Sequence, residues 1–152
     1  MKAYSTFKDF VSEALLLEVG ESSARSFDYE KEMESQMATI YSFITDSGVE
    51  YELEASRVSP ELDHIVQIVF SVDGSVETVV NRGELFRVMA TVMQITREVL
   101  DENPEFRVIA IEPSKNSPND LRRQRLYLAY IKNEWPDAIV KRKGDEIYVK
   151  IK

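Results

Sequence analysis

Few residues of this 152-residue chain have the chemistry of a catalytic or metal-binding site. It has no cysteine and a single histidine, His64, which follows Asp63 at the entrance to an expected strand. A Ser-His-Asp triad or a histidine-based metal site would have to use this residue, and a lone histidine at a loop edge is more often plain surface. The Walker A, Gly-x-Gly-x-x-Gly and HExxH motifs are absent. We therefore expect no metal site, and the common nucleotide-binding and zinc-protease classes are not supported.

A row of carboxylates is the next candidate for acid-base chemistry. Glu50, Glu52 and Glu54 alternate with Tyr51 and Leu53, and a period of two puts alternate residues on opposite faces of a strand. The three glutamates would share one face, where they could act as a base or bind a metal. A solvated sheet face explains the same pattern and is the preferred interpretation.

Positive charge is concentrated in the last quarter of the chain. The formal net charge is −8, yet residues 116–152 contain 9 lysines and arginines against 5 acidic residues. Because most of the chain would repel phosphate backbones, we expect a protein partner rather than nucleic acid. A phosphorylated ligand or an acidic protein surface would fit the cations of a helix face and a hairpin, and a merely solvated face is an equal alternative. These cations are Arg122, Arg125, Lys132, Lys141, Arg142 and Lys143.

The composition is that of one globular domain. Hydrophobic residues make up 43% and charged residues 30% of the chain, and the length is close to the commonest domain size. No apolar run approaches the ~20 residues that span a bilayer. The start of the chain lacks the apolar core of a secretory signal. We expect no membrane association and an intracellular location.

The first 37 residues are predicted to precede the domain. Apolar residues recur at helical spacing in residues 5–18, which indicates a short amphipathic helix that ends the N-terminal segment 1–18. Residues 19–37 are polar and poor in aliphatic side chains, which is typical of a linker, here with a helical turn near Tyr29–Met33. The domain is then expected to span residues 38–152.

The domain is predicted to be α+β, with a mixed, mostly antiparallel sheet and two long helices packed on it. Period-two patterns indicate three antiparallel strands, and the Asp73-Gly74 turn signal suggests a short fourth one. The expected strands are residues 39–45, 49–55, 65–72 and 76–80.

Helical spacing predicts the two helices at residues 82–102 and 120–135, which Pro104 and Pro136 limit. The apolar run at 106–111 should lie parallel to the strand before the first helix, because such crossovers are right-handed. A hairpin at residues 138–142 and 147–151 should close the sheet.

This order, β-β-β-α-β-α-β-β, resembles the GNAT family of N-acyltransferases over residues 38–152. In that family a glycine-containing loop before the central helix binds the pyrophosphate of acetyl-CoA. The matching residues are Asn81, Arg82 and Gly83, so the resemblance implies acetyl-CoA as the cofactor. The sequence departs from the family in having one glycine here and in placing Glu84 where the phosphates would lie.

The segment from Asn119 to Tyr127 looks like the family's Asn…Leu-Tyr segment on its last long helix, one residue longer. The resemblance implies that Tyr127 serves as the general acid for the leaving thiolate. A core tyrosine packed on the sheet is the alternative, and we favour it.

The start of the chain, Met1-Lys2-Ala3-Tyr4 with Phe10-Val11 and Glu13-Ala14, looks like the capsid-targeting peptides of internal proteins from T4-like phages. The resemblance implies cleavage by a prohead protease after Glu18 of Leu16-Leu17-Glu18, so that the mature chain begins at Val19. The position just before a polar linker suits a protease. A helix docked on the domain is the equal alternative.

Two functional classes therefore stay open. One is a phage protein with a GNAT-like domain, packaged in the capsid or acting on the host, that binds a protein and needs no cofactor. It would be found in the virion or in the host cytoplasm. The alternative is an acetyl-CoA-dependent N-acyltransferase.

Overall fold

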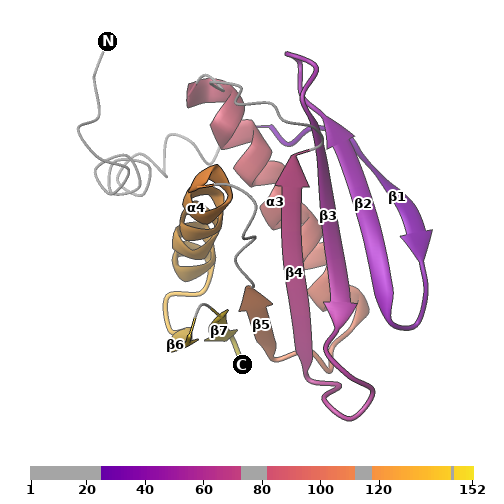
Figure 1. Cartoon of the computed structure of the whole chain (residues 1–152), viewed down its shortest axis with the longest axis vertical. Coiled ribbons are helices and arrows are strands. Elements are labelled where there is room, and N and C mark those ends of the chain that lie inside the picture. The colour runs from indigo at the N-terminus through magenta and orange to yellow at the C-terminus, as the bar shows by residue number, and fades with distance from the viewer. Residues whose placement is uncertain (1–24, 73–81, 112–117, 145) are drawn as a thin grey trace.

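The computed structural model describes residues 25–72, 82–111, 118–144 and 146–152 (Figure 1). The elements of these residues follow one another along the chain as strands and two helices. They are β1 Tyr29–Glu34, β2 Ala38–Ile44, β3 Glu50–Arg57, β4 Ile65–Val72, α3 Arg82–Glu102, β5 Val108–Ile111, α4 Pro118–Glu134, β6 Ile139–Lys143 and β7 Glu146–Lys150.

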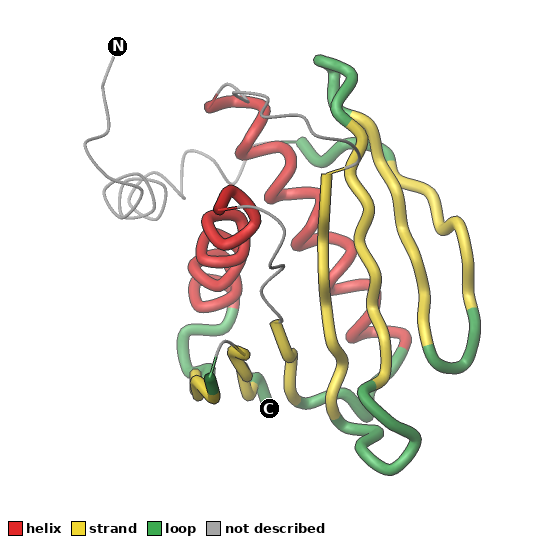
Figure 2. The backbone as a smooth tube through the Cα atoms, viewed as in Figure 1, coloured by secondary structure: helices red, strands yellow, loops and turns green. Residues whose placement is uncertain are grey.

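The strands form one 7-stranded sheet in the order β1-β2-β3-β4-β5-β7-β6 (Figure 2). Only β4 and β5 pair in parallel, with Ile65 opposite Val108, and α3 connects them. The predicted α+β class and the mixed, mostly antiparallel sheet are confirmed. Residues 108–111 of the run predicted at 106–111 pair in parallel with β4, the last described strand before α3, as expected of a crossover connection.

Strand β1 corrects the prediction of a linker with a helical turn near Tyr29–Met33. It pairs antiparallel with β2, with a β-bulge between Lys31 and Met33. The Tyr29 ring packs edge-on against Tyr41, with 6.0 Å between ring centroids. A polar edge strand draws its stability from such pairing with its neighbour. The expected strand at 76–80 lies outside the described residues.

The β2–β3 hairpin follows the predicted alternation. Tyr51 and Leu53 are buried on one face, while Glu50, Glu52 and Glu54 are exposed on the other. Gly48 in the turn has a φ of +87°, a conformation that glycine adopts without a steric penalty. The solvated-face interpretation of the three glutamates agrees with this exposure.

One hydrophobic core joins the sheet to both helices. Val88, Val92 and Ile95 of α3 are fully buried, and so is Ile131 of α4. The predicted closing hairpin is present as β6–β7. It turns at Gly144, which has a φ of +62°, a conformation that glycine adopts without a steric penalty. Neither α3 nor α4 is long and apolar enough to cross a membrane.

Candidate functional site

The cations predicted as a binding surface lie on β6 and α4. Lys141, Arg142 and Lys143 are consecutive residues of β6, and all three are exposed. Strand β6 pairs with β7 alone, so its other side keeps free backbone hydrogen-bonding groups within the described sheet. None of the three cations pairs with a carboxylate in the part of the chain that the structure describes. We call these three residues the basic edge.

The cations of α4 differ in their surroundings. Arg125 is exposed. Lys132 is half-buried, and its Nζ donates a hydrogen bond of 2.9 Å to the carbonyl oxygen of Ala138. A lysine at the end of a helix satisfies carbonyl groups and interacts favourably with the helix dipole. Lys132 therefore holds the connection from α4 to β6, whereas the side chain of Arg122 lies outside those described.

Tyr127 lies in the core between the two helices. It is 0% exposed, and 2.7 Å separate its hydroxyl oxygen from that of Thr96 on α3. Burial raises the pKa of the Tyr127 phenol above its ordinary value. A hydroxyl in this position is enclosed by protein, as a core tyrosine would be, which favours the alternative over a general acid.

The residues proposed for acetyl-CoA lie at the start of α3. Asn81 is outside the described residues, and Arg82 and Gly83 are the first two residues of the helix. Glu84 is 8% exposed and accepts a hydrogen bond from the hydroxyl of Ser47. A carboxylate in the first helical turn interacts favourably with the helix dipole. The same charge would repel a phosphate group at this end of α3.

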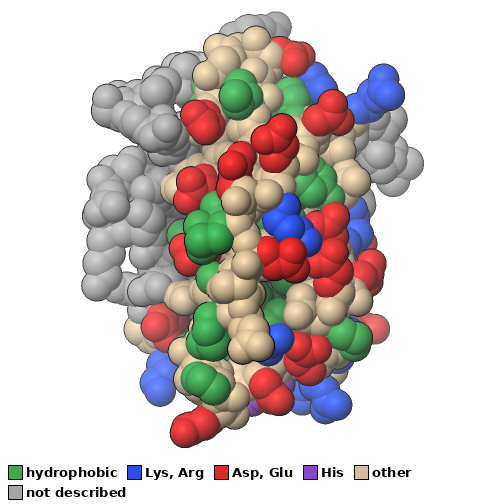
Figure 3. All heavy atoms as spheres, turned by 90° about the vertical axis from the view of Figure 1, so that its right-hand side faces the viewer, with side chains coloured by type: hydrophobic (Ala, Val, Ile, Leu, Met, Phe, Trp, Pro, Cys, Tyr) green, Lys and Arg blue, Asp and Glu red, His purple; other side chains and the backbone are tan. Residues whose placement is uncertain are grey.

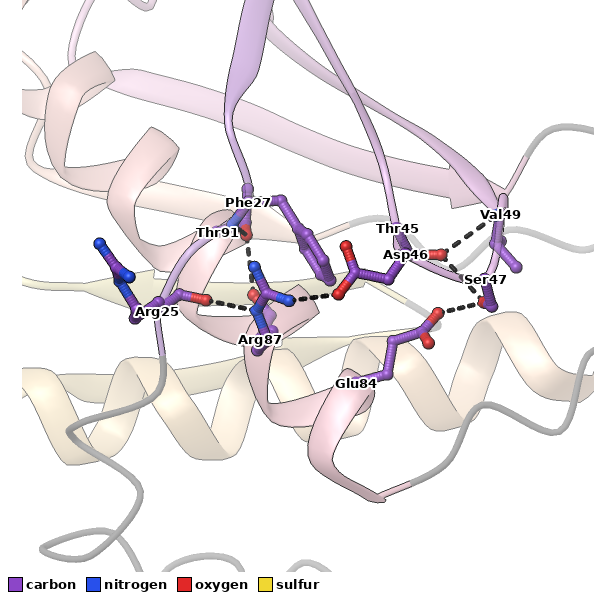
Figure 4. A network of polar contacts seen from close by, with 9 residues as sticks. All are labelled: Arg25, Phe27, Thr45, Asp46, Ser47, Val49, Glu84, Arg87 and Thr91. Atoms are coloured by element: carbon purple, nitrogen blue, oxygen red, sulfur yellow. Dashed lines mark hydrogen bonds and ion pairs between the residues drawn. The ribbon is translucent and has the colours of Figure 1, made fainter.

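A polar network holds the β2–β3 turn and the chain before β1 to this end of α3 (Figure 4). Arg87 donates a hydrogen bond of 2.7 Å to Asp46 and one of 3.0 Å to the carbonyl oxygen of Arg25. Its guanidinium lies 4.0 Å from the centroid of the Phe27 ring. Thr91 accepts a bond of 2.7 Å from the Phe27 backbone N–H. Arg87 thus joins three segments that are distant in sequence.

A groove lies at the other end of α3. It has a volume of about 580 Å³ and is lined by the β1–β2 turn, the adjoining parts of β2 and β3, and the last turn of α3. Tyr41, Ala55 and Glu102 are among its lining residues. Lys31, which lies 3.4 Å from Glu102, is close to its rim. The groove is therefore separated from the proposed acetyl-CoA loop by the length of α3.

Arg57 holds together the loops around this groove. Its guanidinium donates bonds of 3.1 Å to the carbonyl oxygen of Gln36 and 2.6 Å to Glu105, and it lies 4.7 Å from the Phe106 ring centroid. The bond from Arg57 lowers the pKa of the Glu105 carboxyl. With these partners Arg57 has a structural role, and no sequence motif marks it or Arg87.

A carboxylate also connects the tyrosines beside the groove. Tyr29 donates a hydrogen bond of 3.0 Å to Glu98 of α3. Burial, followed by this bond and the charge of Glu98, raises the pKa of Tyr29 to about 12. Burial and the charges of Glu98 and Glu102 also raise the pKa of Tyr41. Both phenols therefore stay protonated at neutral pH, and Tyr29 acts as the donor in its hydrogen bond to Glu98.

Neither a protein-family model nor a curated protein matches the sequence.

The remaining sequence candidates are not brought together into a site. His64 is exposed, and its backbone carbonyl oxygen accepts hydrogen bonds from the backbone N–H groups of Arg107 and Val108. No group of three or more histidine, aspartate or glutamate side chains in the described ranges is placed to hold a metal ion. The expected cleavage residues Glu18 and Val19 lie outside the described residues.

Proposed function

We propose that the protein works by binding an acidic protein surface through its basic edge, with Arg125 as a further exposed cation from the same basic quarter of the sequence. The observation that carries the proposal is the state of Lys141, Arg142 and Lys143. They are exposed, free of carboxylate partners among the described residues, and placed on an edge strand. The partner belongs to a phage virion or to the host cell.

An edge strand with adjacent cations suits an acidic partner in two ways. Its free backbone groups can add a strand of the partner to the sheet, which gives affinity without a deep pocket. Its charges attract the partner, speed the encounter and reject basic surfaces. An edge lined with lysines also discourages pairing with neutral strands. Binding is therefore selective for acidic segments.

The phage setting of the proposal is supported by the resemblance of the first 18 residues to capsid-targeting peptides. The described fold begins at Arg25 and is held at Phe27 by Arg87 and Thr91. Cleavage after Glu18 would leave every described contact in place. Mass spectrometry of the protein from virions tests this step, and an intact Met1 start there would refute processing.

The binding proposal is tested by capture of partners from host lysate. The variant Lys141→Glu/Lys143→Glu reverses two charges of the basic edge, and Arg25→Glu/Arg107→Glu makes the same change at exposed sites elsewhere. We expect the first variant to lose partners that the wild type and the second variant retain. Identical partner lists from all three proteins would show that the basic edge captures no host protein.

Acetyl-CoA-dependent acyl transfer is the second candidate. It is supported by the parallel pair β4–β5 joined by α3, whose first turn follows the proposed cofactor loop. Acetyl-CoA should then raise the melting temperature, because a ligand stabilises the state that it binds. The buried carboxylate of Glu84 at that helix end weighs against this candidate. An unchanged melting temperature at millimolar acetyl-CoA would exclude it.

A further inference from the structure

The two edges of the sheet carry opposite charges. Strand β1 forms the edge opposite β6, and the two lie at opposite sides of the molecule in Figure 1. The exposed residues of β1 include Glu30, Glu32 and Glu34. Figure 3, which faces the β1 side, shows acidic side chains spread over it with basic ones among them. We call Glu30 and Glu32 the acidic edge.

The acidic edge and the lysines of the basic edge lie on the same face of the sheet. Glu30 is opposite Ser42, which is opposite the exposed Glu52 of β3, and Glu32 accepts a bond of 2.5 Å from Ser42. On β6, Lys141 is opposite Tyr148, whereas the alternate residue Val140 is opposite the buried Val149. Paired residues point to the same face, so Lys141 lies on the face away from the core, as Glu52 does.

The one cation of β1 is already neutralised on the other face. Lys31 is opposite the buried Tyr41, and its Nζ lies 3.7 Å from Glu34 and 3.4 Å from Glu102 of α3. Glu34 and Lys31 therefore contribute little to the charge that a neighbouring strand would meet. What remains at this edge is the negative charge of Glu30 and Glu32.

Strand direction and length also match. From β1 to β6 the strand direction reverses at every pairing except β4–β5. Because the number of reversals is odd, β1 runs antiparallel to β6. A second copy in the same orientation would place its β1 antiparallel beside β6, with the faces in register. The strands have 6 and 5 residues, which is enough for a short antiparallel ladder.

Resting on the proposed function, we propose that the acidic partner of the basic edge is β1 of a second copy of this chain. Like charges directly opposite each other are unfavourable. Pairing of two β1 strands would oppose glutamates, and pairing of two β6 strands would oppose lysines. The charges of both edges deter pairing with other strands. The pairing that these charges favour joins β6 of one copy to β1 of the next. Such a contact is heterologous, so it adds copies in a row.

Exchange of charge between the edges tests this pairing. One variant, Lys141→Glu/Lys143→Glu, makes both edges acidic, and the other, Glu30→Lys/Glu32→Lys, makes both edges basic. We expect the wild type to associate with rising concentration in sedimentation velocity, and each variant alone to stay monomeric. An equimolar mixture of the two should associate again, because each edge of one is then complementary to an edge of the other.

A matched control and a salt series complete the test. Glu52→Lys/Glu54→Lys reverses two charges on the same face but away from either edge, and should associate like the wild type. Raising the salt from about 0.05 M to about 0.5 M should weaken the association by about tenfold or more, because exposed charges are then screened. Circular dichroism of each variant confirms that it is folded.

The outcomes separate this inference from the function on which it rests. A wild type that stays monomeric at low salt, or a mixture that fails to associate, overturns self-pairing. If lysate capture through the basic edge persists in that case, the proposed function stands with another acidic partner. If charge reversal at the basic edge changes neither association nor capture, both proposals are wrong.

Discussion

Tyr127 on α4 and Thr96 on α3 place their hydroxyl oxygens 2.7 Å apart in the buried interface between the two helices. Thr96 also donates a bond of 2.8 Å to the carbonyl oxygen of Val92. If Tyr127 donates to Thr96, the hydroxyl protons of both residues are used in hydrogen bonds. The bonds then form one chain from Tyr127 through Thr96 to the carbonyl oxygen of Val92, in which each hydrogen bond strengthens the next.

Removal of one hydroxyl of this pair should destabilise the fold. Tyr127→Phe is expected to lower the free energy of unfolding by about 1 kcal/mol, which is typical of a lost buried hydrogen bond. Thr96→Val should cost more, because it leaves the phenol of Tyr127 without this partner. Urea denaturation of both variants and of the double variant gives the coupling energy. Strictly additive losses would contradict the pairing.

The ion pair of Arg57 and Glu105 should make stability depend on acid pH. The pKa of Glu105 is lowered in the folded protein, chiefly by the hydrogen bond from Arg57. Its stabilising contribution is therefore present above the unfolded value of about 4.3 and is lost as the pH falls through the lower folded value. Glu105→Gln should reduce this acid dependence, measured as the free energy of unfolding between neutral and acid pH.

A matched neutralisation checks that prediction. Glu61→Gln removes an exposed carboxylate from the loop near Arg57 and should keep the wild-type acid dependence. Because the Glu105 side chain is 39% exposed, solvent screens the pair and the effect should stay below about 1 kcal/mol. An unchanged acid profile in Glu105→Gln would show that the pair contributes nothing.

The sequence predicted those elements whose pattern is local. In β3, the alternation of Tyr51 and Leu53 with glutamates identifies a strand without knowledge of its neighbours. Strand β1 has no such pattern, because Tyr29 is its only aromatic residue and the other positions are mostly charged. Its conformation depends on β2 and on the packing of Tyr29 against Tyr41, which are contacts that local composition does not show.

The sequence likewise predicted those parts of the candidate site that are local in the chain and missed those that depend on distant contacts. Charge counting along the chain found the basic edge, since Lys141, Arg142 and Lys143 are adjacent in sequence. That β6 is an edge strand, and that β1 is the opposite edge, follows from the order of strands in the sheet. Arg57 and Arg87 were missed because each is an isolated cation whose partners are distant in sequence.

Arg87 should stabilise the protein through its shape more than its charge. In Arg87→Lys the charge remains, but the planar group that stacks on Phe27 and also bonds the carbonyl oxygen of Arg25 is lost. We expect a loss of about 1 to 2 kcal/mol in the free energy of unfolding. Hydrogen exchange of the Phe27 amide, which donates to Thr91, should become faster.

The partner variant Asp46→Asn separates the two contributions. The Asp46 side chain is 79% exposed, and exposed ion pairs contribute about 1 kcal/mol or less. Asp46→Asn should therefore lower the free energy of unfolding by less than Arg87→Lys does, as measured by thermal or urea unfolding. A loss from Asp46→Asn as large as that from Arg87→Lys would contradict the prediction that Arg87 acts mainly through its shape.

Tyr29 should make stability depend on alkaline pH. Its folded pKa of about 12 exceeds the ordinary value of 10.0 through burial and through Glu98. In the window between these values the unfolded chain ionises the phenol and the folded protein does not. The contribution is therefore complete below about pH 10 and declines as the pH rises toward about 12. Tyr41 and Tyr127, whose pKa values are also raised, act in the same direction.

Glu98→Gln isolates the part that belongs to the carboxylate. Without its negative charge the pKa of Tyr29 should fall toward the ordinary value, while the upward shift due to burial persists. Carbon-13 labelling of the tyrosine rings allows each of the 7 phenols to be titrated separately by NMR. Tyr127, which bonds Thr96, serves as the internal reference and should keep its titration. If Tyr29 titrates at the same pH in the variant and the wild type, Glu98 does not accept its hydrogen bond in solution.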